Sequence, residues 1–338
     1  MRALLVLFAL LTPATASAFE IRSSTVADEG FAIDFGGQLY IRGRGRRPDG
    51  GETRWSSDLQ RARLKTRLSY GDWIRVDIEP DFGGANADLA DAYLQVMPTK
   101  ELSVRVGQHK APFGVLELES RWRMPVLTRG LVSEVVSDRL GFGRRKFGAR
   151  VRWRDKSLPL KPDVQLGAYG PQGDEITEDL AALVRLRLAK KLYVAVTGYS
   201  RRGAATDDRR GNFAAVFVSY DRKGWYAAGE VQLGRVKLLS ATGLETGLDA
   251  TMFTARGVVG RRFEIVEDFE VEPFLAGDLI DPNASTRDDI AVAFRLGFNA
   301  HWRERLRIGA EWGRNTGQVG AIVNPSSALI LFLGTSLD

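Results

Sequence analysis

The sequence from Leu59 to Tyr70, LQRARLKTRLSY, alternates residue by residue between two kinds of side chain. The even positions are uncharged. The odd positions from 61 to 67 carry the cations Arg61, Arg63, Lys65 and Arg67. A period of two residues indicates a β-strand whose two faces meet different surroundings, because an amphipathic helix would repeat every 3.6 residues.

A second stretch, from Ile290 to Trp302, places seven apolar residues at alternate positions. That length is unusual for a strand of a soluble sandwich and ordinary for the wall of a membrane barrel. After Leu11 the chain has no apolar run of the ~18–20 residues that a transmembrane helix needs. Any membrane span must therefore be built from strands.

The same pattern continues along the chain and predicts sixteen strands. The links between them are mostly short after even-numbered segments and longer, polar and Gly-rich after odd-numbered ones, which is the layout of an outer-membrane barrel. The segments are 31–46, 57–69, 73–83, 88–97, 102–110, 147–154, 164–170, 180–189, 192–201, 211–221, 225–236, 249–263, 269–280, 289–303, 306–315 and 328–336.

Aromatic residues lie near the ends of many segments, where the two interfacial girdles of a membrane barrel belong. The expected girdle residues are Tyr40, Tyr70, Trp73, Trp153, Tyr193, Tyr199, Tyr220, Trp225, Tyr226, Trp302 and Trp312.

The N-terminus has the features of a secretory signal peptide. Arg2 supplies a positive charge, residues 3–11 are apolar, and Ala16-Ser17-Ala18 fits a small-residue cleavage site. We therefore expect residues 1–18 to be a cleaved signal and residues 19–338 to form an outer-membrane β-barrel. The expected location is the bacterial outer membrane, with lipid as one partner.

Several kinds of chemistry are poorly supported by the composition. The chain has no cysteine and only two histidines, His109 and His301, which we expect at opposite ends of the barrel. No Walker A, HExxH or GxSxG pattern is present. We expect no catalytic residue, no metal site and no cofactor, and hence no enzyme.

The net charge is +6, and the role of the basic residues depends on whether their side chains point toward the lipid or into the lumen. Charges on the lipid face would cost ~2–4 kcal/mol each near the midplane, so the alternation sends the basic residues of the strands into the lumen. Because they alternate inward along strands, we expect no nucleic-acid partner. The candidate pore-lining and anion-binding residues are Arg61, Arg63, Lys65, Arg67, Arg105, Lys110, Arg121, Arg123, Arg129, Arg150, Arg152, Arg154, Arg185 and Arg187.

Acidic residues also point inward and could neutralise part of this set. Asp77, Glu79 and Asp81 belong to the segment next to the cations of 57–69, where cross-strand ion pairs form. For each arginine, a structural ion pair and a role in permeation remain open. The cations of 147–154 and 180–189 have fewer acids nearby and are the better candidates for permeation.

The longest connection, residues 111–146, is long enough to fold inward and narrow the pore. Motifs around it resemble the phosphate-selective porin O and P family. The similarity is strong over about 35–150 and only architectural beyond. The matching stretches are GGQLY at 36–40, DLADAYL at 88–94, VRVGQHKAPFG at 104–114, RLG at 139–141 and FGA at 147–149.

The resemblance implies a sixteen-stranded homotrimeric porin whose third loop constricts each pore, with basic residues that attract small anionic solutes. Lys110 and Lys146 flank the loop, but no lysine lies between them. Arginines, including Arg121, Arg123 and Arg129, take that place.

These observations together favour an outer-membrane porin for passive diffusion of small anions through an Arg-lined pore, with phosphate and other oxyanions as candidate solutes. The alternatives are a general diffusion porin without anion specificity and a structural or receptor barrel. A soluble all-β protein is a further alternative, although it would have to bury long apolar faces.

Overall fold

The computed structural model describes residues 30–84, 87–170, 177–203, 211–237, 249–285, 289–303, 305–317 and 325–337. The expected signal peptide and its cleavage site lie outside these residues. No helix in the described ranges is long and apolar enough to cross a membrane.

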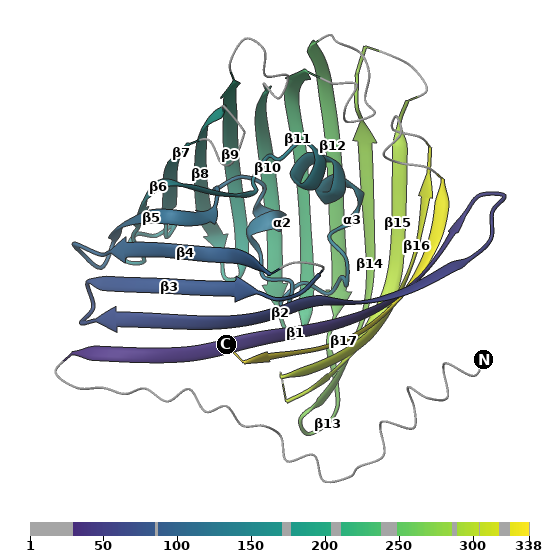
Figure 1. Cartoon of the computed structure of the whole chain (residues 1–338), viewed down its shortest axis with the longest axis horizontal. Helices are drawn as coiled ribbons and strands as arrows, with labels where there is room; N and C mark the ends of the chain where they lie inside the picture. The colour runs from purple at the N-terminus through teal and green to yellow at the C-terminus, as the bar shows by residue number, and fades with distance from the viewer. Residues whose placement is uncertain are drawn as a thin grey trace.

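The described strands form one closed antiparallel sheet, because β1 pairs with β2 on one side and with β17 on the other (Figure 1). The strands are β1 Phe31–Pro48, β2 Arg54–Tyr70, β3 Ile74–Asp81, β4 Asp88–Val96, β5 Leu102–Lys110, β6 Arg145–Arg154, β7 Asp163–Tyr169, β8 Thr177–Ala189, β9 Leu192–Gly203, β10 Gly211–Arg222, β11 Trp225–Lys237, β12 Asp249–Arg261, β13 Phe263–Val266, β14 Phe269–Asp281, β15 Ala291–Trp302, β16 Leu306–Thr316 and β17 Ser326–Leu337.

The barrel has sixteen strands, as the sequence predicts. β12 and β13 are two parts of one barrel strand, since both pair with β14 and only Arg262 separates them. The expected segment 249–263 is therefore interrupted at its end. β1 and β2 are longer than predicted, at 18 and 17 residues.

The two faces of each strand meet different surroundings, as the alternation predicts. On β15, Phe294, Leu296 and Phe298 point outward and are 41–53% exposed. Their neighbours Arg295 and Asn299 point inward and are buried. An outward apolar band of this kind matches the lipid-facing surface of an outer-membrane barrel.

Substitution of Val216 by arginine is expected to destabilise the barrel by about 2–4 kcal/mol, because Val216 points outward near the middle of β10. The matched control is Tyr220→Arg on the same face near the turn, which is expected to cost only about 0–1 kcal/mol. Urea unfolding in lipid vesicles measures both values. Equal effects at the two positions would contradict this placement of the membrane.

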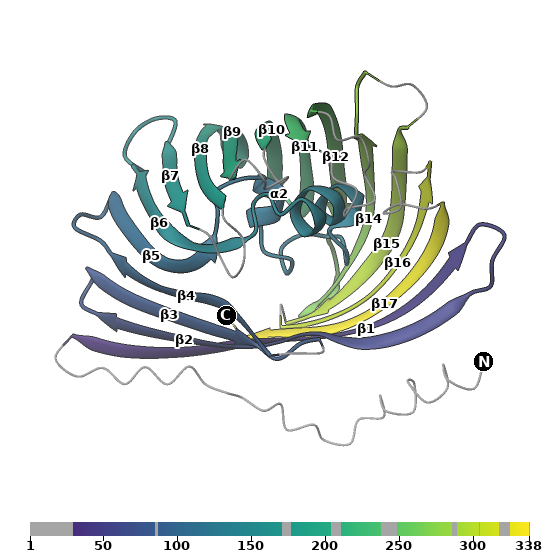
Figure 2. The same ribbon diagram turned by 45° about the horizontal axis from the view of Figure 1, so that its top comes forward.

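The long connection after β5 folds into the barrel and contains short helices (Figure 2). They are α2 Val115–Leu118, α3 Gly130–Val132 and the π-helix η1 Ser133–Arg139. Because β6 already begins at Arg145, the loop spans residues 111–144, not 111–146. These residues are called the third loop below.

The third loop packs against one side of the inner wall through apolar contacts. Phe113, Val135 and Phe142 pack with residues of β9 and β10, and Val115 and Leu127 belong to a second cluster that includes β10, β14 and β17. The pore therefore lies between the third loop and the opposite wall, formed by β1 to β8.

Four aromatic residues expected at the membrane interface lie on inward-facing positions instead, namely Tyr40, Tyr193, Tyr199 and Tyr226. Tyr40 and Tyr199 are 1% and 3% exposed and pack beneath the third loop, and Tyr226 packs against the second of the two apolar clusters. They lie on the inward-facing register of their strands, which a position near a strand end does not reveal. Tyr70, Trp73, Trp153 and Trp302 are exposed, in agreement with a girdle.

Candidate pore constriction

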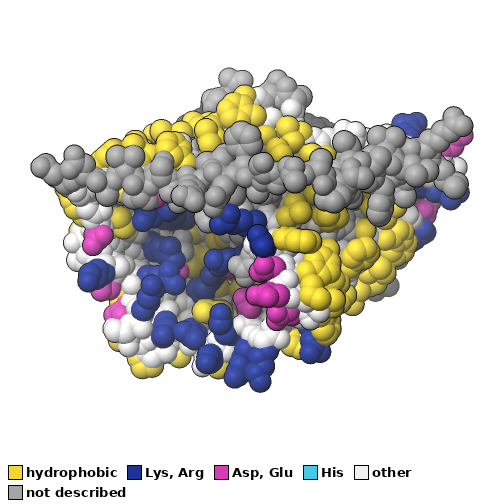
Figure 3. Space-filling model, turned by 90° about the horizontal axis from the view of Figure 1, so that it is seen from below, with side chains coloured by type: hydrophobic (Ala, Val, Ile, Leu, Met, Phe, Trp, Pro, Cys, Tyr) yellow, Lys and Arg dark blue, Asp and Glu magenta, His cyan; other side chains and the backbone are white. Residues whose placement is uncertain are grey.

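Among the cavities of the described residues, two lie between the third loop and the wall formed by β1 to β8. The turn-side cavity, of about 470 Å³, includes Lys65, Arg152 and Asp163, which are near the short turns of the barrel. The loop-side cavity, of about 490 Å³, includes Asp88, Ser137 and Arg144. Figure 3 shows Lys and Arg side chains gathered over the middle of the face seen from below, with fewer Asp and Glu beside them.

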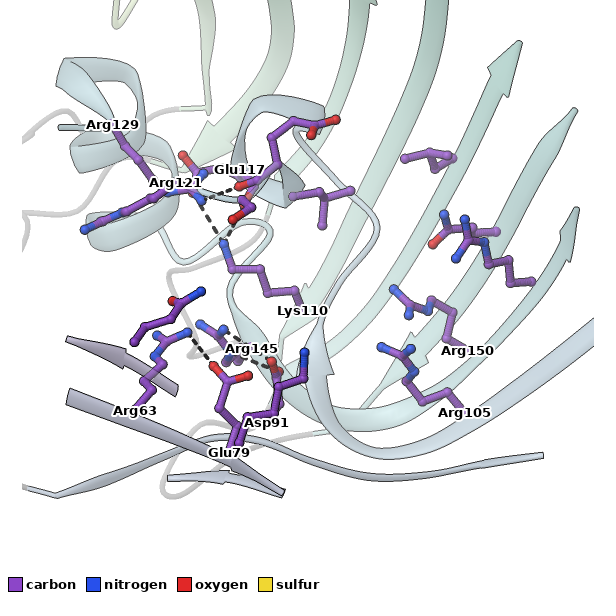
Figure 4. Close-up of a pocket in the computed structure, with 18 of the residues that line it drawn as sticks. Arg63, Glu79, Asp91, Arg105, Lys110, Glu117, Arg121, Arg129, Arg145 and Arg150 are labelled. Atoms are coloured by element: carbon purple, nitrogen blue, oxygen red, sulfur yellow. Dashed lines mark hydrogen bonds and ion pairs between the residues drawn. The ribbon is translucent and has the colours of Figure 1, made fainter. Parts of the chain in front are cut away.

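The residues that line both cavities mark the constriction between them. They come from β2, β5, β6 and the third loop, and Figure 4 shows the loop residues facing the wall residues across the pore. Six of the seven are cationic: Arg61, Arg63, Lys110, Glu117, Arg121, Arg129 and Arg145.

Wall carboxylates neutralise two of these cations. Arg63 bonds Asp81 at 2.6 Å and Glu79 at 2.7 Å. Arg145 bonds Asp91 at 3.0 Å.

Further along β2, Arg67 bonds Asp77 at 3.0 Å. The predicted cross-strand pairing of β2 cations with Asp77, Glu79 and Asp81 is thus confirmed, as expected for opposite charges on neighbouring antiparallel strands.

Glu117 of α2 forms ion pairs with one cation of the third loop and with two cations of the wall. Its carboxylate lies 3.3 Å from Arg129, 3.1 Å from Arg256 of β12 and 3.9 Å from Lys110. Burial alone would raise the pKa of Glu117, but the charges of Arg129, Arg256 and Lys110 outweigh burial and hold that pKa well below its usual range. Glu117 therefore stays ionised throughout the physiological pH range.

Arg61 and Arg121 have no carboxylate partner among the described residues. Arg61 donates to the amide oxygen of Gln38 at 2.9 Å and lies over the ring of Tyr40. Arg121 donates to the side-chain oxygen of Gln60 at 2.9 Å, when that amide is oriented to satisfy both of its ends. Burial and the charge of Arg129 lower the pKa of Arg121 to about 10, so it remains positive at neutral pH.

Side chains on the wall, among them Arg307, Glu311, Arg295 and Glu230, hold the third loop in this position. Arg307 of β16, 2% exposed, donates to Asn299 at 2.9 Å and to the loop carbonyls of Arg121 at 3.1 Å, Met124 at 3.0 Å, Pro125 and Val126. The other three make contacts at 2.7–3.1 Å: Glu311 with Leu127 N–H, Arg295 with Thr128 C=O and Glu230 with Leu116 N–H.

Alternation alone predicts that these four side chains face inward. It cannot show that they bind the backbone of a segment about 100–190 residues away in the sequence. We found no motif in the sequence that would have identified this role.

Ten of the fourteen predicted pore residues line the turn-side cavity. Arg67, Arg123, Arg154 and Arg187 line neither cavity, and Arg123 and Arg154 are exposed. The expectation of few acids near β6 and β8 holds only in part. Arg152 bonds Asp163 at 2.8 Å and Arg185 bonds Glu119 of the loop at 3.1 Å.

The two histidines have structural partners. His301 bonds Glu272 at 3.1 Å, and His109 lies 3.3 Å from the Tyr169 hydroxyl. Within the described ranges, no three His, Cys, Asp or Glu residues come together as metal ligands.

Comparison with known proteins agrees with this architecture. Residues 28–153 match the family phosphate-selective porin O and P, which confirms the resemblance seen in the sequence. No curated protein matches the chain significantly.

Several solved outer-membrane proteins share the fold at low sequence identity. OmpF of Salmonella typhi, solved with daunomycin, has a TM-score of 0.68 at 10% identity, over 93% of this chain and 100% of that chain. OmpT of Vibrio cholerae, in a trimer form, has a TM-score of 0.64 at 11% identity, over 91% and 99%. An anion-selective porin from Comamonas acidovorans has a TM-score of 0.62 at 11% identity, over 91% and 100%.

The closed sixteen-stranded barrel with its inward-folded third loop therefore has the fold of outer-membrane porins, and residues 28–153 match the phosphate-selective porin O and P family.

Proposed function

We propose that this protein is an outer-membrane porin that conducts small anions in preference to cations. The observation that carries the proposal is the pair of arginines at the constriction, Arg61 and Arg121, which face the pore without a carboxylate partner in the described chain. Positive side chains at the narrowest part of a pore attract anions and repel cations.

The charge of the turn-side cavity supports the same conclusion. Eleven cationic side chains and five carboxylates line it, so a net positive potential remains after every ion pair is formed. One of the structural neighbours is itself described as an anion-selective porin. Phosphate and other oxyanions are candidate solutes because guanidinium groups bind them well.

The test is the reversal potential of the purified protein in a planar bilayer under a KCl gradient. A reversal potential with the sign of the chloride equilibrium potential supports the proposal. A potential near zero would leave a general diffusion porin, and a potential of the sign set by potassium would refute anion preference.

Acidification is expected to increase anion selectivity through Asp138, which lines the loop-side cavity. The Asp138 side chain is open to the lumen, but the enclosing protein removes part of its hydration. This loss, together with the charge of Glu117, raises the pKa of Asp138. A carboxyl group with a raised pKa becomes neutral first as the pH falls, and the pore then loses a negative charge.

Asp138→Asn is therefore expected to be more anion-selective than the wild type at pH 7 and to change less between pH 7 and pH 4. The effect is expected to be about twofold in the permeability ratio, because this is one charge away from the constriction. Reversal potentials at the two pH values measure it. An identical pH response in both proteins would rule out Asp138 as the titrating group.

We also propose that the protein is a homotrimer. A trimer form of a structural neighbour supports this assembly. Chemical cross-linking in detergent that gives a band of three subunits agrees with it, and monomers alone would exclude it.

A further inference from the structure

Arg105 of β5 and Arg150 of β6 lie directly opposite each other in the antiparallel register. Side chains at such positions have Cβ atoms about 4.5–5.5 Å apart, and like charges placed there repel each other. Both side chains line the turn-side cavity, and Figure 4 shows them next to each other. The pair is therefore unfavourable unless a negative group lies beside it.

No acid shares the row of residues that runs across the wall through this pair. Gln95 of β4 is opposite Arg105, and Gly167 of β7 is opposite Arg150. The acids in the surrounding rows each bond a different arginine at 2.8–3.0 Å. These pairs are Asp77 with Arg67, Asp91 with Arg145 and Asp163 with Arg152.

The two guanidinium groups are held differently. Arg105 lies over the Tyr93 ring, 3.7 Å from its centroid, and donates to Gln95 through Nη2 at 2.8 Å and Nε at 3.3 Å. Its Nη1 is left for another acceptor. Arg150 makes no hydrogen bond or ion pair with any residue that the structure describes, so its whole fork of donors is available.

We propose that Arg105 and Arg150 form an oxyanion-binding site on the turn side of the constriction. Nη1 of Arg105 and the free guanidinium of Arg150 can donate to two different oxygens of the same carboxylate or phosphate group. A chloride ion is a single atom and does not offer two acceptors. The inference rests on the proposed anion conduction and extends it, because an anion that passes Arg61 and Arg121 meets a second site in the same cavity.

The test is block of single-channel chloride current by acetate and, separately, by inorganic phosphate. We expect these probes to block the wild-type channel. The half-blocking concentration should rise about tenfold in Arg150→Gln and in Arg105→Gln, since each variant loses charge-assisted hydrogen bonds. Arg150→Lys keeps the charge but lacks the fork, so its block should be intermediate. Block by only one probe would assign the site to that chemistry.

Arg154→Gln is the matched control, because Arg154 is exposed at the end of β6 and lines neither cavity. Its block should equal that of the wild type. A heat-modifiable band on a denaturing gel confirms that each variant has formed the barrel.

Two different failures can be told apart by the KCl reversal potential measured on the same channels. If the wild type prefers chloride but neither probe blocks it, or if block is unchanged in the Arg105 and Arg150 variants, the oxyanion site is refuted and anion conduction stands. If the wild type does not prefer chloride, the proposed function itself fails, and the site with it.

Discussion

Replacement of Arg61 and Arg121 together by glutamine is expected to lower the ratio of anion to cation permeability about tenfold or more. A unit charge about 6 Å from a permeating ion changes that ion's free energy by about 0.7 kcal/mol in water. The change has opposite signs for anions and cations, so the loss of one charge alters the ratio by up to about tenfold. Screening by salt reduces the effect, and removal of both charges offsets that reduction.

These two residues are chosen because neither has a carboxylate partner in the described chain, whereas Arg63 and Arg145 are paired with wall carboxylates. The measurement is the reversal potential under a KCl gradient. Arg123→Gln is the matched control, since Arg123 lies on the same loop but is exposed and lines neither cavity. Equal selectivity of the double variant and this control would show that other residues determine ion preference.

Replacement of Arg307 by glutamine is expected to free part of the third loop and to raise the single-channel conductance about twofold. The guanidinium donates to four loop carbonyls, and glutamine cannot reach them all. Each carbonyl left buried without a donor costs about 1–3 kcal/mol. The interaction between β16 and the loop segment that carries Arg121 is therefore weakened by several kcal/mol. The segment moves more freely, and the constriction becomes wider on average.

Arg303→Gln is the control for this experiment. Arg303 lies at the end of β15 and forms a 3.0 Å ion pair with Asp268, but both side chains are at least half exposed. An exposed pair contributes little, so conductance and stability should be unchanged. Unaltered conductance and unaltered noise in the Arg307 variant would falsify the assignment of Arg307 as the residue that positions the loop.

The sequence alone determined the barrel and the direction of most side chains. Strict alternation in 59–70 and 290–302 requires one face to meet an apolar surrounding, and a shift of one residue would expose every cation to lipid. This constraint determines which residues of each strand point into the barrel and which point toward the lipid. The pairing of Asp77, Glu79 and Asp81 with the cations of β2 could be predicted for the same reason, because neighbouring strands bring these residues together.

Only the tertiary structure decided which cations remain without a carboxylate. Arg129 and Arg121 lie on the same loop, yet Arg129 bonds Glu117 while Arg121 meets only a neutral amide. Arg105 and Arg150 are unneutralised because the register places Gln95 and Gly167 beside them. These outcomes depend on contacts between segments far apart in sequence, and alternation carries no information about them.

The sequence pattern likewise does not predict against which part of the wall the third loop packs. Its packing on the far wall depends on inward-facing Tyr40 and Phe217 and on the hydrogen bonds of Arg307 and Glu311. Alternation tells which face a residue takes, since that follows from the pleat of one strand. What fills the space inside a barrel follows from the shape of the closed sheet, and that shape exists only after all sixteen strands have paired.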